Sequence, residues 1–130
     1  MRRAFRYVLL GLSALFLAAV VVQVFFAGLM LFGQEGGTGL HANTGWIIHT
    51  AAFLFLLVPA LAFAGARTIV LGVVLFAVTF VQPFLPEADT PLVAGLHPVV
   101  ALAMFTLSIL LTRRALVLVR EERQVAAVPG

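Results

Sequence analysis

Four long apolar stretches, separated by short polar connections, constrain this chain more than any other feature of its sequence. They cover about residues 7–32, 41–63, 68–85 and 91–111, and each is close to or above the roughly 20 residues that a helix needs to cross a bilayer. The chain of 130 residues is 63% hydrophobic and only 10% charged, which is more apolar surface than one soluble domain of this size can bury. The sequence therefore predicts a single domain, an all-α integral membrane four-helix bundle with the lipid bilayer as its solvent.

The arginines fix the expected orientation of the four spans. Arg67 lies between spans two and three, and all other arginines precede span one or follow span four, whereas Glu35, Glu87 and Asp89 lie in the other two connections. Because positive connections stay in the cytoplasm, we expect a multi-pass protein of the cytoplasmic (inner) membrane with both termini inside. The net charge of +3 is then an orientation signal, and no nucleic-acid partner is implied.

The two ends of the chain are expected to play different parts. The basic opening Arg2-Arg3 resembles a secretion signal, but the apolar run behind it is longer than the 7 to 15 residues of a signal core, so we interpret span one as a retained anchor. Residues 112–130 form a cytoplasmic tail. We expect it to extend the last helix by a few turns as a solvated charged segment, and to end in disordered residues 127–130.

Several classes of site are absent from the sequence. The chain has no cysteine, which excludes disulfides, thiolate metal sites and cysteine nucleophiles. No glycine-rich loop follows a strand, and no serine lies beside a usable base. These absences argue against hydrolases, kinases and nucleotide-binding enzymes, and favour an electron carrier or an accessory protein.

An internal repeat relates the first half of the chain to the second. Val22-Gln23-Val24-Phe25 precedes Leu40-His41, and Val81-Gln82-Pro83-Phe84 precedes Leu96-His97 at nearly the same spacing. Two such hairpins would pack about a pseudo-twofold axis along the membrane normal, so that spans two and four present equivalent side chains to each other.

The histidines are the residues most suited to chemistry. His41, Gly45 and His49 follow at four-residue intervals and share one face of span two, while His97 lies on span four, where Pro98 should bend the helix two turns from its start. Two imidazoles on different helices, with a glycine leaving a flat gap, are what a b-type haem with two histidine ligands requires. We expect His97 to bind the iron with His41, its counterpart in the repeat, although His49 matches His97 better in depth.

Two glutamines lie near this set. Gln23 and Gln82 occupy the outer halves of spans one and three, from which they could reach a histidine, a haem propionate or the head group of a quinone. Hydrogen bonding between helices without any ligand is the alternative. It corresponds to a rival function, a cofactor-free accessory or scaffold subunit of a membrane complex, or a small transporter.

These motifs resemble those of an uncharacterised family of small bacterial four-span membrane proteins. The resemblance rests on the two Val-Gln motifs, on His41 with Gly45 four residues later, and on Leu96-His97-Pro98; the family implies no particular activity. More distantly, the layout is similar to one four-helix half of haem A synthase, and this likeness implies that His41 and His97 bind haem. Ala42 stands where those enzymes usually carry arginine, and the chain is half as long, so haem A synthesis is not implied.

The leading interpretation is thus a haem b protein that transfers electrons in the cytoplasmic membrane. Its expected partners are a quinol, an extracytoplasmic acceptor or another membrane subunit, and homo-oligomers are compatible with its size.

Overall fold

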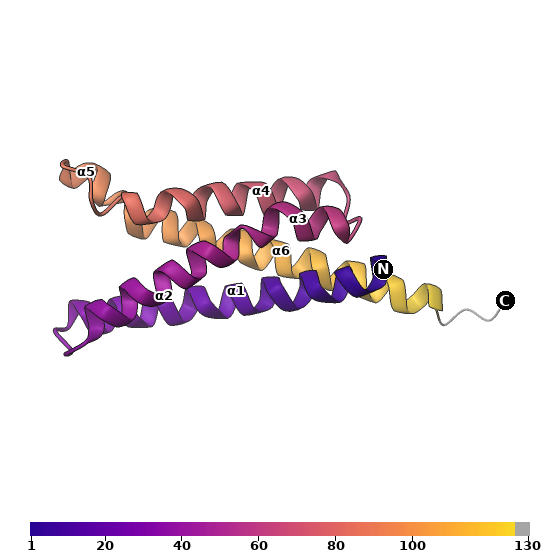
Figure 1. The fold of residues 1–130 in the computed structure, drawn as a ribbon, viewed down its shortest axis with the longest axis horizontal. Helices are drawn as coiled ribbons and strands as arrows, with labels where there is room; N and C mark the ends of the chain where they lie inside the picture. The colour runs from indigo at the N-terminus through magenta and orange to yellow at the C-terminus, as the bar shows by residue number, and fades with distance from the viewer. Residues whose placement is uncertain (127–130) are drawn as a thin grey trace.

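The computed structural model describes residues 1–126 and consists of helices joined by short turns (Figure 1). Helices α2 and α3 together form the second span, and α5 and α6 form the fourth, so this part of the chain has four helices long and apolar enough to cross a membrane. The expected all-α four-helix bundle is confirmed. The expected disorder of residues 127–130 lies outside the described residues. In chain order, the elements are α1 (Arg2–Leu31), α2 (Gly37–Ala52), α3 (Leu54–Leu61), α4 (Ala66–Val81), the 3-10 turn η1 (Gln82–Phe84), α5 (Pro91–Ala94) and α6 (Leu96–Ala126).

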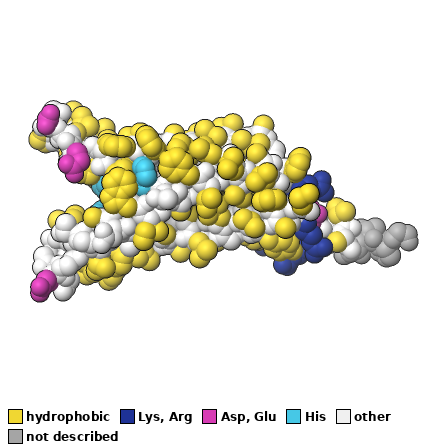
Figure 2. Space-filling view, in the orientation of Figure 1, with side chains coloured by type: hydrophobic (Ala, Val, Ile, Leu, Met, Phe, Trp, Pro, Cys, Tyr) yellow, Lys and Arg dark blue, Asp and Glu magenta, His cyan; other side chains and the backbone are white. Residues whose placement is uncertain are grey.

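The two ends of the bundle differ in charge. Figure 1 shows the start of α1 and the end of α6 on one side, and Figure 2 shows that the arginines gather there, while acidic side chains mark the tips of the opposite end. Between them lies a belt of apolar side chains that face outward, among them Phe25 (61% exposed), Ile47 (68%) and Leu102 (67%). Such a belt is stable when lipid surrounds it.

The connection between the first two spans is tighter than the sequence indicates. Helix α2 begins at Gly37, before the expected start near residue 41, because Gly36 adopts a positive φ of 79° that turns the chain back directly after α1. At Gly37, an added Cβ would lie 2.8 Å from the backbone nitrogen of Met30. The second span is then interrupted at Phe53, whose amide bonds to the carbonyl of Thr50.

The fourth span also differs from a continuous helix. Helix α5 ends at Ala94, the amide of Gly95 bonds to the carbonyl of Pro91, and α6 begins at Leu96. His97 and Pro98 therefore lie in the first turn of α6, and the irregularity expected ahead of Pro98, about two turns into the fourth span, is present as an interruption at Gly95. A proline costs little there, because amides in the first turn have no helical partner to lose.

The two hairpins bury the same positions. In α1 and in α4, the buried residues lie three, seven, ten and fourteen positions before Gln23 and Gln82 respectively. After His41 and His97, both second helices bury the positions seven, eleven, fourteen and eighteen residues on. The first helices thus match as Val20, Phe16, Ser13 and Leu9 with Thr79, Leu75, Gly72 and Thr68, and the second helices as Ile48, Ala52, Phe55 and Pro59 with Met104, Ser108, Leu111 and Ala115. The bundle is therefore built from two repeated hairpins.

Small residues let the hairpins approach closely. Helix α1 packs on α6 through a face where Ser13 and Ser108 are fully buried. Their hydroxyls donate to the carbonyls of Leu9 (2.8 Å) and Met104 (2.6 Å), one turn back in their own helices. Each serine hydroxyl therefore has a hydrogen-bond partner within its own helix. A polar group inside a membrane needs such a partner because lipid offers none.

Helix α4 meets α3 at a carbonyl that the helix itself leaves free. Pro59 has no N–H to donate to the carbonyl of Phe55, and Gly72 of α4 packs so closely on this oxygen that an added Cβ would lie 2.7 Å from it. The glycine is therefore required by space at the centre of the bundle.

The tail of α6 is more firmly held than a solvated segment would be. Arg6 donates to the carboxylate of Glu122 (2.7 Å) and to the carbonyl of Leu118 (3.3 Å), and both charged side chains are mostly buried. The side chain of Arg123 donates to the hydroxyl of Tyr7 (3.1 Å). The expectation of a merely solvated segment is thus wrong for these residues, because α1 runs alongside the extension and pairs with it.

We expect Gly72→Ala to lower the free energy of unfolding by about 1–3 kcal/mol, because the new methyl group forces α4 away from the carbonyl of Phe55. Thermal unfolding of the purified protein in detergent measures this change. Gly11→Ala is the matched control, since nothing lies within 4 Å of its added Cβ. Equal melting temperatures for the Gly72→Ala variant and the unaltered protein would contradict the packing described.

Candidate functional site

Each hairpin holds one histidine by the same pair of hydrogen bonds. The side-chain amide of Gln23 donates to the backbone carbonyl of His41 (2.7 Å), and Nδ1 of His41 lies 3.2 Å from the backbone carbonyl of Gln23. Gln82 and His97 make the same exchange at 2.9 and 3.1 Å. The repeated Gln and His motifs of the sequence are therefore one structural unit that occurs twice.

This exchange fixes the tautomer of both rings. A backbone carbonyl only accepts hydrogen bonds, so Nδ1 of His41 and of His97 must carry the hydrogen. In the neutral imidazole, Nε2 then keeps its lone pair, and in residues 1–126 no hydrogen bond involves either Nε2. Histidines that bind metals typically donate their second N–H to a carbonyl or carboxylate in this way.

The rings of His41 and His97 lie close together in an edge-to-face arrangement. The centroids of the His41 and His97 rings lie 6.0 Å apart, with the ring planes inclined at 64°. An ion bound by two imidazole nitrogens at about 2 Å each, with each ring centre about 1 Å beyond, spaces the centres about 6 Å apart. Each ring can rotate about its own bond to the ion, so the inclination is also compatible with such a site.

The space around the pair is open. Helix α2 packs on α1 and α4, and α6 packs on α1 and α4, but α2 and α6 are not among the helix pairs that pack extensively on each other within the described residues. Figure 2 shows the acidic end of the molecule forked, with histidine side chains at the base of the fork. Both rings are half-buried, so the pair is reachable from the fork.

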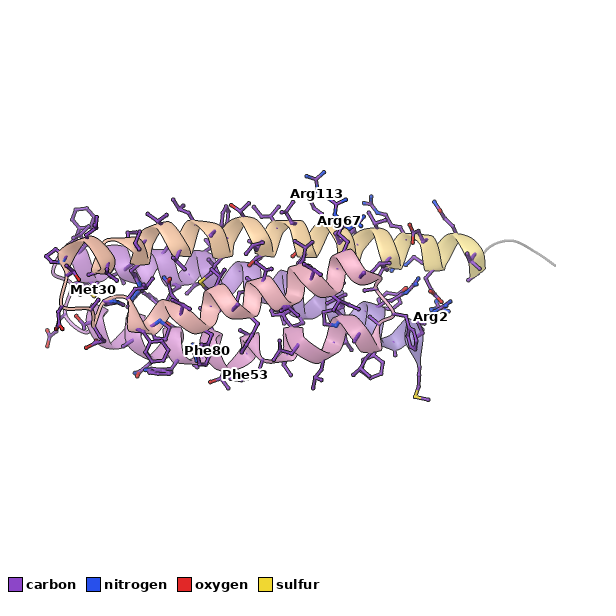
Figure 3. All side chains as sticks on the ribbon, turned by 90° about the horizontal axis from the view of Figure 1, so that it is seen from above. Arg2, Met30, Phe53, Arg67, Phe80 and Arg113 are labelled. Atoms are coloured by element: carbon purple, nitrogen blue, oxygen red, sulfur yellow. The ribbon has the colours of Figure 1, made fainter. Side chains whose placement is uncertain are left out.

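His49 lies away from this pair. Its ring packs among aromatic side chains, with centroids 5.4 Å from Trp46, 5.4 Å from Phe80 and 6.3 Å from Phe53; Figure 3 shows Phe53 and Phe80 on neighbouring helices. Its Nδ1 is buried and has no hydrogen-bond partner in the described part of the chain. The structure therefore places His41, and not the depth-matched His49, opposite His97.

Gly45 makes room for a glutamine. An added Cβ at this position would lie 3.0 Å from Nε2 of Gln23, so the expectation that this glycine leaves a flat gap for a ring edge is wrong. The close approach lets the Gln23 amide reach His41.

Thr44 is a site residue that the sequence interpretation missed. Its hydroxyl contacts Oε1 of Gln23, and its place three residues after His41, on the same helix face, was the available signal. The second hairpin has Val100 at this position, and Oε1 of Gln82 is accordingly buried without a partner among residues 1–126.

Comparisons with protein-family models, with curated proteins and with solved structures found no match to this chain. The site therefore has to be interpreted from its own geometry.

We expect His41 and His97 to be neutral Nδ1–H tautomers in protein prepared without added ligands. Nitrogen NMR of protein with ¹⁵N-labelled histidine, at a pH above 8 and in detergent, measures which ring nitrogen carries the hydrogen. His41→Gln and His97→Gln assign the signals. An Nε2–H tautomer at either position would contradict the exchange with the glutamine carbonyls.

Proposed function

We propose that this protein binds one haem b between His41 and His97 and transfers electrons in the cytoplasmic membrane. The observation that carries the proposal is the opposed pair of rings, 6.0 Å apart, with both Nδ1 atoms already tied to carbonyls. Each ring keeps an Nε2 lone pair in this half-buried site, and the two together would suit a shared positively charged centre. No third His, Cys, Asp or Glu joins them in residues 1–126, so a two-ligand centre that brings its own equatorial ring fits better than a bare ion.

The residues around the pair would hold and tune such a group. The carbonyls of Gln23 and Gln82 orient the imidazoles, and the glutamine amides fasten the backbone on which each ring sits. His41 and His97 would hold the haem through their Nε2 atoms, and neither ring would then be available to bind oxygen or a substrate. Haem held in this way supplies one-electron chemistry, which favours electron transfer over an oxygenase or a hydrolase.

The position of the pair suggests the direction of electron flow. We place the arginine-rich end with both termini in the cytoplasm, following the distribution of positive charge. Gln23 lies 17 residues beyond Arg6 in α1, which is about 25 Å along the helix axis. The pair then sits near the extracytoplasmic surface. We infer that a quinol in the bilayer serves as donor and an extracytoplasmic protein or small molecule as acceptor.

An optical spectrum of protein expressed with haem available tests the proposal. We expect a Soret band with about one haem per chain, and sharpened visible bands on reduction by dithionite, as two histidine ligands produce. His41→Ala and His97→Ala should each lose most of the bound haem. His49→Ala is the matched control and should keep it, since its ring belongs to the aromatic cluster.

Two results would overturn this function. One is the absence of a Soret band in folded protein that elutes as a single species, which would favour the cofactor-free scaffold or accessory subunit. The other is loss of haem in His49→Ala with retention in His41→Ala, which would assign the ligands differently.

A further inference from the structure

Three arginines converge on a cavity at the opposite end of the bundle from the histidine pair. Arg67 at the start of α4 and Arg113 and Arg114 of α6 line a cavity of about 330 Å³. Figure 3 shows Arg67 and Arg113 side by side. The remaining walls are apolar and consist of Leu71, Leu110 and Val117.

These arginines have no counter-charge among the residues that the structure describes. Arg2 and Arg6 pair with Glu122, and Arg123 donates to Tyr7. Among residues 1–126, by contrast, no carboxylate lies within ion-pair distance of Arg67, Arg113 or Arg114. Three neighbouring positive charges repel one another, and a bound anion would remove this cost.

The repeat supplies an internal comparison. Counted from Gln23 and His41, the positions equivalent to Arg67, Arg113 and Arg114 are Val8, Leu57 and Val58. The apolar wall residues have apolar equivalents in Leu12, Leu54 and Leu61. The equivalent positions in the first hairpin are therefore apolar throughout, and packing of the hairpin does not require arginines there.

Two of the three apolar wall residues lie toward the middle of the bundle from the arginines, whereas Val117 lies toward the end of α6. Leu71 lies one helical turn deeper than Arg67, and Leu110 one turn deeper than Arg114. Arg6 donates a hydrogen bond to the backbone carbonyl of Leu118 near the end of the bundle. Arg113 precedes Leu118 by five residues, so it lies about 7.5 Å further into the bundle along the axis of α6. With the arginine-rich end at a membrane surface, the arginines would lie at the level of lipid head groups and the two leucines at the level of acyl chains.

We propose that this cavity binds the phosphate of an anionic phospholipid, with one acyl chain lying along Leu71 and Leu110. Guanidinium groups bind phosphate oxygens through paired hydrogen bonds, and basic pockets between membrane helices select anionic head groups. The apolar wall directly beyond the arginines favours a lipid over a free anion. The bound lipid would bridge α4 and α6 at the cytoplasmic surface.

Native mass spectrometry of the full-length protein tests this site. The protein is incubated with equal amounts of phosphatidylglycerol and phosphatidylcholine before release from the detergent micelle. We expect phosphatidylglycerol to be retained preferentially, and its adduct to weaken about tenfold or more in the Arg67→Gln, Arg113→Gln double variant. Arg120→Gln is the matched control, because Arg120 lies on α6 and is exposed but does not line the cavity.

A second arm separates a lipid from a soluble anion. The melting temperature is measured with phosphatidylglycerol, phosphatidylcholine or inorganic phosphate, and only the first should raise it, with the increase lost in the double variant. Stabilisation by inorganic phosphate alone would assign the cavity to a soluble anion and overturn the proposal. Equal retention of the two lipids, or equal retention in the double variant and in Arg120→Gln, would overturn it as well.

Discussion

Polar groups inside a membrane must find their partners within the protein, and the exchange between a glutamine and a histidine is how this chain meets that requirement. An unpaired amide or imidazole at depth costs a few kcal/mol. Here, each glutamine donates to the backbone of a histidine, and each histidine donates back to the backbone of its glutamine. The exchange fastens two helices of a hairpin together. Because it occupies Nδ1, it also leaves Nε2 of each ring as the free basic nitrogen.

The repeat turns this local arrangement into a site. Because both hairpins bury the same positions relative to their glutamine and histidine, packing about the pseudo-twofold brings the two units face to face. One histidine alone would be a satisfied side chain at the end of a helix. Two of them, opposed and with matching tautomers, form an arrangement that suits a shared ligand.

The places where the two hairpins differ are as informative as those where they agree. The first hairpin has Thr44 and Gly45 where the second has Val100 and Ala101, so only Gln23 gains a partner for its Oε1. The second hairpin has arginines in a groove that is apolar in the first. The common fold accounts for the positions at which the two hairpins agree. The positions at which they differ must be explained by what each end of the molecule contacts.

Apolar length and arginine placement were sufficient to predict the four spans, and the repeated motifs predicted the pairing of His41 with His97 in space. Counting residues from the outer end of each span could not show whether His41 or His49 lies opposite His97. Such a count assumes continuous helices, whereas the fourth span is interrupted at Gly95, just before His97. The role of Gly45 was misjudged because the reach of Gln23 depends on how closely α1 and α2 pack. The contact between Arg6 and Glu122 joins residues far apart in the sequence, and neither side chain alone indicates it.

In the proposed function, the two Nε2 atoms jointly bind one iron. Electron paramagnetic resonance of the oxidised, haem-loaded protein tests it most directly, because the spin state reports the number and type of axial ligands. If both rings bind the iron, the signal is low-spin ferric, of the kind that two imidazoles produce. In His41→Ala or His97→Ala most of this signal is lost together with the haem, and any haem that remains bound is high-spin. A high-spin signal from the unaltered protein would contradict the claim, because at least one of the two rings would then not bind the iron.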